Sequence, residues 1–365
     1  MSNLKADNIY YNFNITNDPD VNNNVILAQR EINFDQILLE NPQDFYVSIQ
    51  RFSVSGKSIP LMICPIVANQ PNKNLTPWRI TLQNPTSGAF FTQDIIWIPD
   101  NDVNPSLVNQ PIPIQDLTYL DGEYYYLYTY EKIANLFNTA FSTAMIQLKI
   151  LDATIPANYV APYFLFNVDN GKFELITDIR NTVDIFMNVI SELLFDGFRT
   201  FSPTNPNLFR KFIIEILPNN ENENFVNGVS TSPRTLITRQ EYSNIDYINS
   251  AKSIIFISNT LGNQKEFIST KGTDTSGLNG ISILTDFEFP FDTLGGPRQK
   301  LQYSTTGISN LRLVNINNIN PIKKLDVSVF WQDNLGRIFP LYLVRGGYVS
   351  IKFVFVRKTL FKNLS

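Results

Sequence analysis

The sequence predicts an all-β protein with one packed helix, and three observations lead to this prediction. Phenylalanine and tyrosine, which favour strands, are abundant, with 28 and 16 residues. Short apolar runs alternate with polar residues at a period of two, the pattern of half-buried strands. Segments rich in asparagine and proline, which favour loops, separate these runs. Together these features indicate many short strands joined by long polar loops.

The first part of the chain combines a polar segment with several predicted strands. Residues 1–30 are polar and rich in asparagine, and we expect an N-terminal arm that is ordered only when something holds it. Residues 45–55 alternate cleanly between apolar and polar side chains, which predicts a strand. Residues 78–82 and 89–98 are expected to form two strands around an Asn-Pro-Thr-Ser-Gly turn.

The period of the apolar residues changes within residues 123–148. Residues 124–128 are predominantly tyrosine and have the character of a strand. Apolar residues then recur at spacings of three and four, which predicts an amphipathic helix over about residues 130–147. Thr129 is a suitable N-cap, and Glu131 in the first turn interacts favourably with the helix dipole. We therefore expect one helix lying on a sheet.

The middle of the chain contains a hairpin signal and a long polar segment. Residues 163–168 and 172–177 flank an Asp-Asn-Gly sequence, which predicts a β-hairpin. Residues 184–198 fit either a short helix or a strand followed by a helical turn, and periodicity does not decide between them. Residues 219–247 are mostly polar, and we expect a long loop there.

The predicted strands outnumber the eight that a minimal two-sheet sandwich requires. Either a lobe is inserted into the main domain or a second small sheet exists. We take residues 31–365 as the main domain, and 84–122 and 200–252 as candidate positions for an inserted lobe. At this chain length a hydrophobic core needs no disulfide or metal to stabilise it.

The C-terminal stretch, residues 323–358, has the most regular strand pattern. Three apolar runs of strand length occupy residues 325–331, 338–344 and 349–356. A polar loop ending in Gly336 separates the first two, and the pair Gly346 and Gly347 separates the second from the third. Both connections have the chemistry of tight turns. The stretch therefore predicts a three-stranded antiparallel meander.

The same stretch resembles the end of the penton (minor capsid) protein of virophages and Polinton-like viruses. The residues that carry this resemblance are Trp331, Gly336, Pro340, Gly346, Gly347, Lys352 and Phe355. The run of tyrosines leading into a helix that carries Asn138 resembles the same family. The resemblance implies a single jelly-roll β-sandwich that forms homopentamers at the fivefold vertices of an icosahedral virion. It also implies a double jelly-roll major capsid protein as a partner, with assembly inside the infected host cell.

Composition removes most enzymatic mechanisms from consideration. The chain has no histidine and only Cys64, which excludes histidine-dependent triads, thiolate zinc sites and an intramolecular disulfide. No glycine-rich phosphate loop is present, so we expect no cofactor, no metal and no catalytic activity. Paired carboxylates, as in glycosidases, remain at Asp286 with Glu288 and at Glu192 with Asp196, and we favour solvated surface pairs.

Three further alternatives stay open at this point. Exposed aromatic residues in loops would also suit a carbohydrate-binding or attachment module. Residues 100–104 resemble a calcium loop only faintly, and we favour a turn. The basic C-terminal end, with Lys352, Arg357, Lys358 and Lys362, is the only segment expected to contact nucleic acid, and blunting of an edge strand is the preferred explanation. No signal peptide or membrane helix is predicted, so we expect a soluble intracellular protein.

Overall fold

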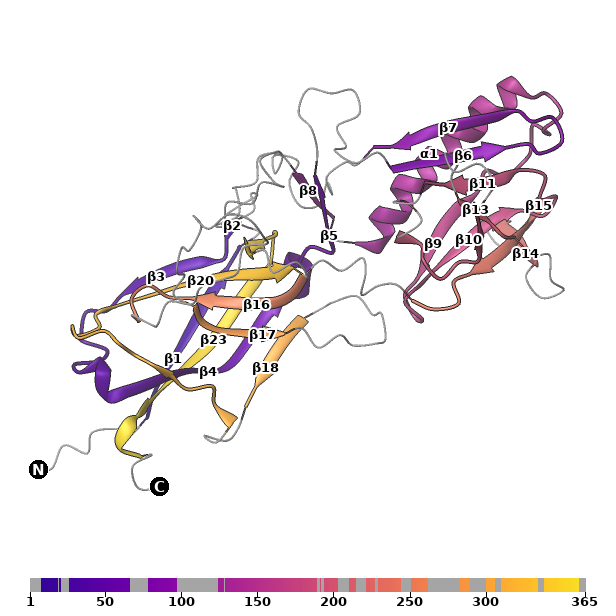
Figure 1. Cartoon of the computed structure of the whole chain (residues 1–365). Helices are drawn as coiled ribbons and strands as arrows, with labels where there is room; N and C mark the ends of the chain where they lie inside the picture. Colours follow the sequence, from indigo (N-terminus) through magenta and orange to yellow (C-terminus); the bar gives the residue numbers. More distant parts are fainter. Residues whose placement is uncertain are drawn as a thin grey trace, which may run out of the picture.

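The computed structural model describes residues 8–18, 20, 26–65, 78–96, 124–127, 129–188, 191, 194–202, 210–214, 221–226, 229–243, 251–261, 283–288, 300–305, 310–333 and 338–360. Figure 1 shows two lobes, one built from strands near both ends of the chain and the other built around helix α1 (Tyr130–Leu151). A two-stranded ribbon of β5 (Met62–Pro65) and β8 (Tyr124–Leu127) lies between the lobes (Figure 1).

The first lobe is a jelly roll, as its strand pairing demonstrates. Its eight strands are β1 (Asn8–Thr16), β3 (Gln29–Asn33), β4 (Phe45–Ser55), β16 (Ala251–Ile257), β17 (Ile283–Glu288), β18 (Lys300–Ser304), β20 (Lys324–Asp333) and β23 (Tyr348–Arg357). The first of these strands pairs with the last, the second with the seventh, the third with the sixth and the fourth with the fifth. One long antiparallel hairpin is thus rolled into a sandwich, and the predicted single jelly roll is confirmed.

The rolled hairpin forms two sheets. The first sheet has the order β1–β23–β4–β18, with β19 (Val314–Asn315) also paired to β4. The second sheet has the order β17–β16–β20–β21, where β21 spans Ile338–Pro340, and β3 pairs with the other end of β20. Short additional elements are β2 (Ile26–Leu27), β22 (Tyr342–Leu343) and the 3₁₀ turns η1 (Pro42–Asp44), η2 (Gly56–Ser58) and η5 (Lys358–Leu360).

The core of the jelly-roll lobe lies between these two sheets. On β23, Ile351, Phe353 and Phe355 are fully buried, because alternate side chains of a strand point to the same face. Trp331 on β20 lies in the same cluster and is 1% exposed. Burial of a large apolar side chain contributes about 1.5–3 kcal/mol, so the alternating pattern that predicts these strands also stabilises the sandwich.

The second lobe, which we call the helical lobe, comprises the described residues between 78 and 243. Its strands are β6 (Trp78–Gln83), β7 (Phe90–Ile95), β9 (Tyr163–Asn167), β10 (Lys172–Asp178), β11 (Asp184–Met187), β12 (Thr200–Phe201), β13 (Arg210–Phe212), β14 (Glu221–Val226) and β15 (Val229–Arg239). They form the sheets β12–β13–β11–β6–β7 and β14–β15–β10–β9. Helix α1 contacts strands of both sheets.

The predicted helix is confirmed and extends one turn further than the expected end at residue 147. The hydroxyl of Thr129 accepts a hydrogen bond from the backbone N–H of Lys132 at 3.2 Å, which makes Thr129 the N-cap. The buried face of α1 packs into a second apolar cluster rich in phenylalanine. In that cluster the rings of Phe164 and Phe195 stack with their centroids 4.0 Å apart. The second cluster shares no residue with the core of the jelly roll.

The chain leaves the jelly roll after β4 and returns at β16. We therefore propose that residues 56–250 form one lobe inserted between the third and fourth strands of the rolled hairpin. The candidate regions 84–122 and 200–252 both fall largely within this segment, although residues 97–123 lie outside the described part of the chain. Within the expected N-terminal arm, residues 8–16 form β1 along the full length of β23.

Several element predictions are confirmed and two are wrong. Strand β4 and the β6–β7 and β9–β10 hairpins lie where the sequence predicts them. The predicted loop at residues 219–247 is wrong, because β14 and β15 pair with each other there. The three-stranded meander is also wrong: β20 pairs with β21, whereas β23 lies in the opposite sheet between β1 and β4. The turn at Gly346 therefore carries the chain across the sandwich rather than along one sheet.

The described part of the chain contains no helix with both the length and the apolar character needed to span a membrane.

Candidate functional site

The C-terminal residues singled out in the sequence have structural positions. Trp331 stacks on Phe339 with ring centroids 4.5 Å apart, and both side chains are buried in the jelly-roll core. Pro340 ends β21 opposite Phe330 of β20. Phe355 is fully buried on β23. Gly336 lies outside the described residues.

Gly346 and Gly347 form the turn that leads into β23. Gly346 has a φ of +73°, a left-handed conformation that glycine adopts without strain. A Cβ atom at Gly347 would lie 2.6 Å from the Ser58 hydroxyl and 2.8 Å from the Val344 carbonyl oxygen. Each glycine is thus required for a different reason, the first by its conformation and the second by close packing. We propose that these C-terminal residues serve the fold of the jelly roll.

The basic residues of the C-terminal end lie over aromatic rings. The ammonium group of Lys352 lies 4.9 Å from the centroid of the Tyr10 ring, and that of Lys358 lies 5.0 Å from Tyr46. The guanidinium group of Arg357 lies 5.3 Å from the ring of Phe45. Such cation–π contacts hold the charges over the ends of β1 and β4. Lys362 lies outside the described residues.

Of the four carboxylates considered for catalysis, the three that the structure describes are on the surface. Asp286 and Glu288 are both exposed on β17, and Asp286 forms a 3.5 Å ion pair with Arg312. Asp196 is also exposed, whereas its suggested partner Glu192 lies outside the described residues. These positions are those of solvated surface charges. Residues 100–104, considered as a calcium loop, also lie outside the described residues.

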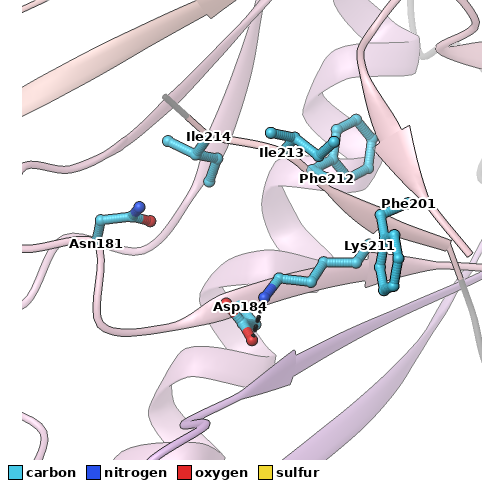
Figure 2. Close-up of a pocket in the computed structure, with 7 residues that line it drawn as sticks. All are labelled: Asn181, Asp184, Phe201, Lys211, Phe212, Ile213 and Ile214. Atoms are coloured by element: carbon cyan, nitrogen blue, oxygen red, sulfur yellow. Dashed lines mark hydrogen bonds and ion pairs between the residues drawn. The ribbon is translucent and has the colours of Figure 1, made fainter. Parts of the chain in front are cut away.

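A pocket of about 270 Å³ lies in the helical lobe, beside β11, β12 and β13 (Figure 2). The Lys211 ammonium group and the Asp184 carboxylate form an ion pair of 2.6 Å at its wall. Phe201, which is 54% exposed, offers an aromatic ring at the edge, and Asn181 contributes a polar side chain. Ile213 and Ile214 complete an apolar part of the lining. The pocket therefore combines an accessible ring with hydrogen-bonding groups.

The sequence analysis did not single out Asp152, a buried carboxylate at the C-terminal end of α1. Asp152 accepts hydrogen bonds from Asn84 Nδ2 at 2.7 Å, from the Ser87 hydroxyl at 2.5 Å, and from both the backbone N–H and the hydroxyl of Thr154 at 2.9 and 2.6 Å. The hydrogen bonds from Ser87, Thr154 and Asn84 hold the pKa of Asp152 well below its ordinary value. This group connects the β6–β7 turn to the C-terminus of the helix, which is a structural task.

Two further aspartates have similar environments. Burial opposes ionisation of Asp178, yet hydrogen bonds from Arg180 and the Val160 N–H lower its pKa overall. Burial likewise opposes ionisation of Asp326, and hydrogen bonds from Thr260 and its neighbours lower the pKa of that carboxyl. Thr154 and Arg180 lie two residues after Asp152 and Asp178, whereas the other donors come from distant segments. No sequence motif marks these three aspartates, because those distant donors become neighbours only in the folded chain.

Within the described residues, no group of three or more acidic or cysteine side chains is arranged to hold a metal ion. The features found are a sandwich of eight rolled strands, hydrogen-bonded carboxylates and a second lobe that carries a pocket. These features define a jelly-roll protein with a second, helix-bearing lobe, and the jelly roll is a fold that occurs in viral capsids.

Comparison with known proteins identifies the family. The family described as Sputnik minor capsid protein V18/19 matches residues 9–357. The chain is 26% identical to the "Structural protein V19" of Sputnik virophage over 214 residues, which cover 55% of this chain and 96% of the relative. It is also 26% identical to the "Uncharacterized protein V18" of the same virophage over 169 residues, covering 44% of this chain and 92% of the relative.

Solved structures agree with this fold over nearly the whole chain. A chain in the 3.5 Å cryo-EM structure of the Sputnik virophage matches with a TM-score of 0.72 and 24% identity, covering 98% of this chain and 99% of that chain. The crystal structure of the mavirus penton protein matches with a TM-score of 0.60 and 17% identity, covering 96% and 99%. The chain therefore belongs to the family of the Sputnik minor capsid protein, and it is a structural protein of a virion.

Proposed function

We propose that the protein forms homopentamers that close the fivefold vertices of an icosahedral capsid. The observation that carries this proposal is the likeness, over 96% of the chain, to a protein that is itself described as a penton. Membership of a minor capsid family supports the same role, because vertices need far fewer copies than the remaining capsid surface. A ring of five copies requires each subunit to present one face to a different face of the next.

The neighbours at such a vertex would be copies of a major capsid protein. We propose a double jelly-roll major capsid protein as this partner, in agreement with the resemblance seen in the sequence. Vertex proteins contact both their own copies and the surrounding shell. Assembly of the pentamer therefore has to be examined both alone and beside that partner.

The solution mass of the purified protein tests the proposal directly. Five chains of 41.7 kDa amount to about 208 kDa, which light scattering separates clearly from a monomer or trimer. We expect that mass, together with fivefold rings in negative-stain images. A protein that stays monomeric at high concentration, and also when mixed with the major capsid protein, would contradict the vertex role.

A second candidate function, recognition of a carbohydrate, is favoured by the pocket in the helical lobe. The exposed ring of Phe201 offers a surface on which the apolar face of a sugar packs, and the side chains of Asp184 and Asn181 offer partners for hydroxyl groups. A glycan array probed with the wild type and with Phe201→Ala tests this. Binding that Phe201→Ala abolishes would support the attachment function, and an empty array would eliminate it.

A further inference from the structure

The first sheet of the jelly roll has an unusual distribution of charge. Its strands β1, β4, β18, β19 and β23 contain no aspartate or glutamate. They contain four basic residues, which are Arg51, Lys300, Lys352 and Arg357. The whole chain, in contrast, has 33 acidic and 29 basic residues and a net charge of −4. The absence of carboxylates from one whole sheet therefore departs from the composition of the rest of the protein.

Two of these cations lie side by side on the outer face of the sheet. Arg51 on β4 is directly opposite Lys352 on β23. Each lies next in sequence to a core residue, Phe52 and Ile351 respectively, so both side chains point away from the core. Like charges directly opposite on neighbouring strands destabilise a sheet. Among the described residues neither cation has an acidic partner, so no described carboxylate offsets this repulsion.

The surroundings of this pair suit a protein contact. The other outward positions of the sheet carry mostly short uncharged polar side chains, which include Asn12, Asn14, Ser53, Gln302 and Ser350. Tyr10, which is 51% exposed, lies beneath the ammonium group of Lys352 and restricts its position. Low charge density combined with accessible tyrosine is typical of the central part of protein interfaces.

The outer face of the second sheet differs from this basic face. Its centre is a buried apolar cluster of Ile255, Ile257, Ile283 and Ile338, and its exposed carboxylates, Glu31, Asp286 and Glu288, lie on the outer strands β3 and β17. Asp326 is hydrogen-bonded within the turn at residues 258–260, and Asp333 is buried. On β17, Phe287 points into the core, so Asp286 and Glu288 on either side of it point outward. Glu288 has no basic partner among the described residues.

We infer that the outer face of the first sheet, centred on Arg51 and Lys352, binds the exposed β17 edge of the second sheet of a neighbouring copy, at Asp286 and Glu288. The two faces point in opposite directions because they belong to the two sheets of one sandwich. A basic face on one sheet and an acidic edge on the other produce a head-to-tail contact, which is the heterologous contact that a closed ring needs. This inference rests on the proposed pentamer and specifies which surfaces build it.

The same charges argue against other contacts of these faces. Two copies of the first face cannot pair with each other, because Arg51 and Lys352 would meet like charges. Nucleic acid would also neutralise these cations. However, the exposed carboxylates on the opposite face of the same sandwich repel a polyanion that extends past the edge of the sheet. A second copy of the chain uses both faces at once.

Charge reversal on each face, followed by reversal on both, tests this contact. Arg51→Glu with Lys352→Glu makes both faces acidic, and Asp286→Lys with Glu288→Lys makes both faces basic. We expect each double variant to lose the 208 kDa species and to associate at least about tenfold more weakly than the wild type. The quadruple variant, in which the polarity is inverted but complementary, should recover the ring.

Controls separate loss of the contact from loss of the fold. Lys57→Glu with Lys132→Glu makes the same change in net charge outside both sheets and should leave the ring intact. Arg51→Gln with Lys352→Gln preserves size and polarity, and should weaken the ring less than the glutamates do. When the variants and the wild type are measured in high salt as monomers, their melting temperatures should be close to one another.

The possible outcomes distinguish the contact from the pentamer itself. A wild-type pentamer whose charge-reversed variants remain pentameric with unchanged dissociation would overturn the inferred contact and leave the proposed vertex role standing. If the charge-reversed variants remain pentameric and lose only binding to duplex DNA, the inferred contact is likewise overturned and the proposed vertex role stands. A wild type that never forms pentamers, even beside the major capsid protein, would overturn the vertex role and this contact together.

Discussion

Trp331 is the largest fully buried side chain among the described residues, and its removal tests the core of the jelly roll. It is 1% exposed and stacks on Phe339 at 4.5 Å. We expect Trp331→Ala to lower the free energy of unfolding by about 3–5 kcal/mol, because truncation leaves a cavity that a packed core fills only partly. Urea denaturation monitored by circular dichroism measures this loss.

An exposed apolar residue provides the comparison for Trp331. Ile319 is 78% exposed, and Ile319→Ala should change the free energy of unfolding by no more than about 0.5 kcal/mol. A loss below about 1 kcal/mol for Trp331→Ala would show that the tryptophan does not support the core. The same loss in both variants would mean that burial does not distinguish the two sites.

The Asp152 carboxylate should make stability depend on pH in the acid range. Its hydrogen bonds from Ser87, Thr154 and Asn84 lower the pKa in the folded state below the value in the unfolded chain. In the acid range the unfolded chain therefore binds more protons than the folded chain does. The stabilisation that ionised Asp152 provides is present above about pH 4 and is lost as the pH falls below that value. We expect Asp152→Asn to lower the melting temperature most at pH 7 and progressively less toward pH 3.

The matched control for Asp152 is Asp35→Asn, which neutralises an exposed carboxylate in the jelly-roll lobe. Its melting temperature should follow that of the wild type across the same pH range. Thermal melts at half-unit intervals of pH provide the measurement. A difference between Asp152→Asn and wild type that stayed constant with pH would show that the hydrogen bonds do not favour the ionised form.

At the scale of elements, the turn before β23 depends on two glycines in different ways. Gly346→Ala should cost about 1–2 kcal/mol, because its φ of +73° is unfavourable for a side chain while the space around it is open. Gly347→Ala should cost more, because the new Cβ would overlap the Val344 carbonyl oxygen, which belongs to the backbone. Equilibrium unfolding of both variants ranks them.

A third glycine calibrates this comparison. Gly88 in the β6–β7 turn has a φ of +76° and open space around it, so Gly88→Ala should resemble Gly346→Ala. If Gly347→Ala proved the mildest of the three, close packing at the turn would not constrain the entry into β23. The comparison thus separates backbone strain from steric overlap within one protein.

The elements that the sequence predicts correctly are those specified by local signals. Helix α1 has a 3.6-residue period and a capping threonine, and the β9–β10 hairpin has an Asp-Asn-Gly turn. The predicted meander is wrong because turn residues indicate that a chain reverses, but not which sheet the next strand joins. The strand β15 was missed because its polar side chains lack a two-residue period, and its pairing with β10 and β14 supplies the order instead.

At the scale of the whole molecule, the jelly roll depends on pairings between distant segments. Strand β1 pairs with β23 more than 300 residues away, and only such pairing shows that Arg51 lies opposite Lys352. The basic character of the C-terminal end could be predicted from the sequence. The absence of acidic residues from the first sheet could not, because five separate segments of the chain build that sheet. The candidate structural residues Trp331 and Phe355 were predictable, because their apolar alternation is local.

The two apolar clusters should also respond independently to mutation. Phe164 lies in the core of the helical lobe, where its ring stacks on that of Phe195. The backbone N–H and carbonyl of Phe164 both form hydrogen bonds with the side chain of Asn138. Phe164→Ala should destabilise that lobe by about 3–5 kcal/mol. Because the clusters share no residue, we expect faster hydrogen exchange in α1, β9 and β10, and unchanged exchange in β4 and β23.

The reciprocal variant completes this comparison. Phe353 is fully buried in the jelly-roll core, and Phe353→Ala should speed exchange in β1, β4 and β23 more than in α1. Exchange measured by mass spectrometry on both variants gives the two patterns side by side. Equal loss of protection in both lobes from either change would mean that they unfold as one cooperative unit. The proposed insertion between β4 and β16 would then be an integral part of the folding unit rather than an independent addition to the jelly roll.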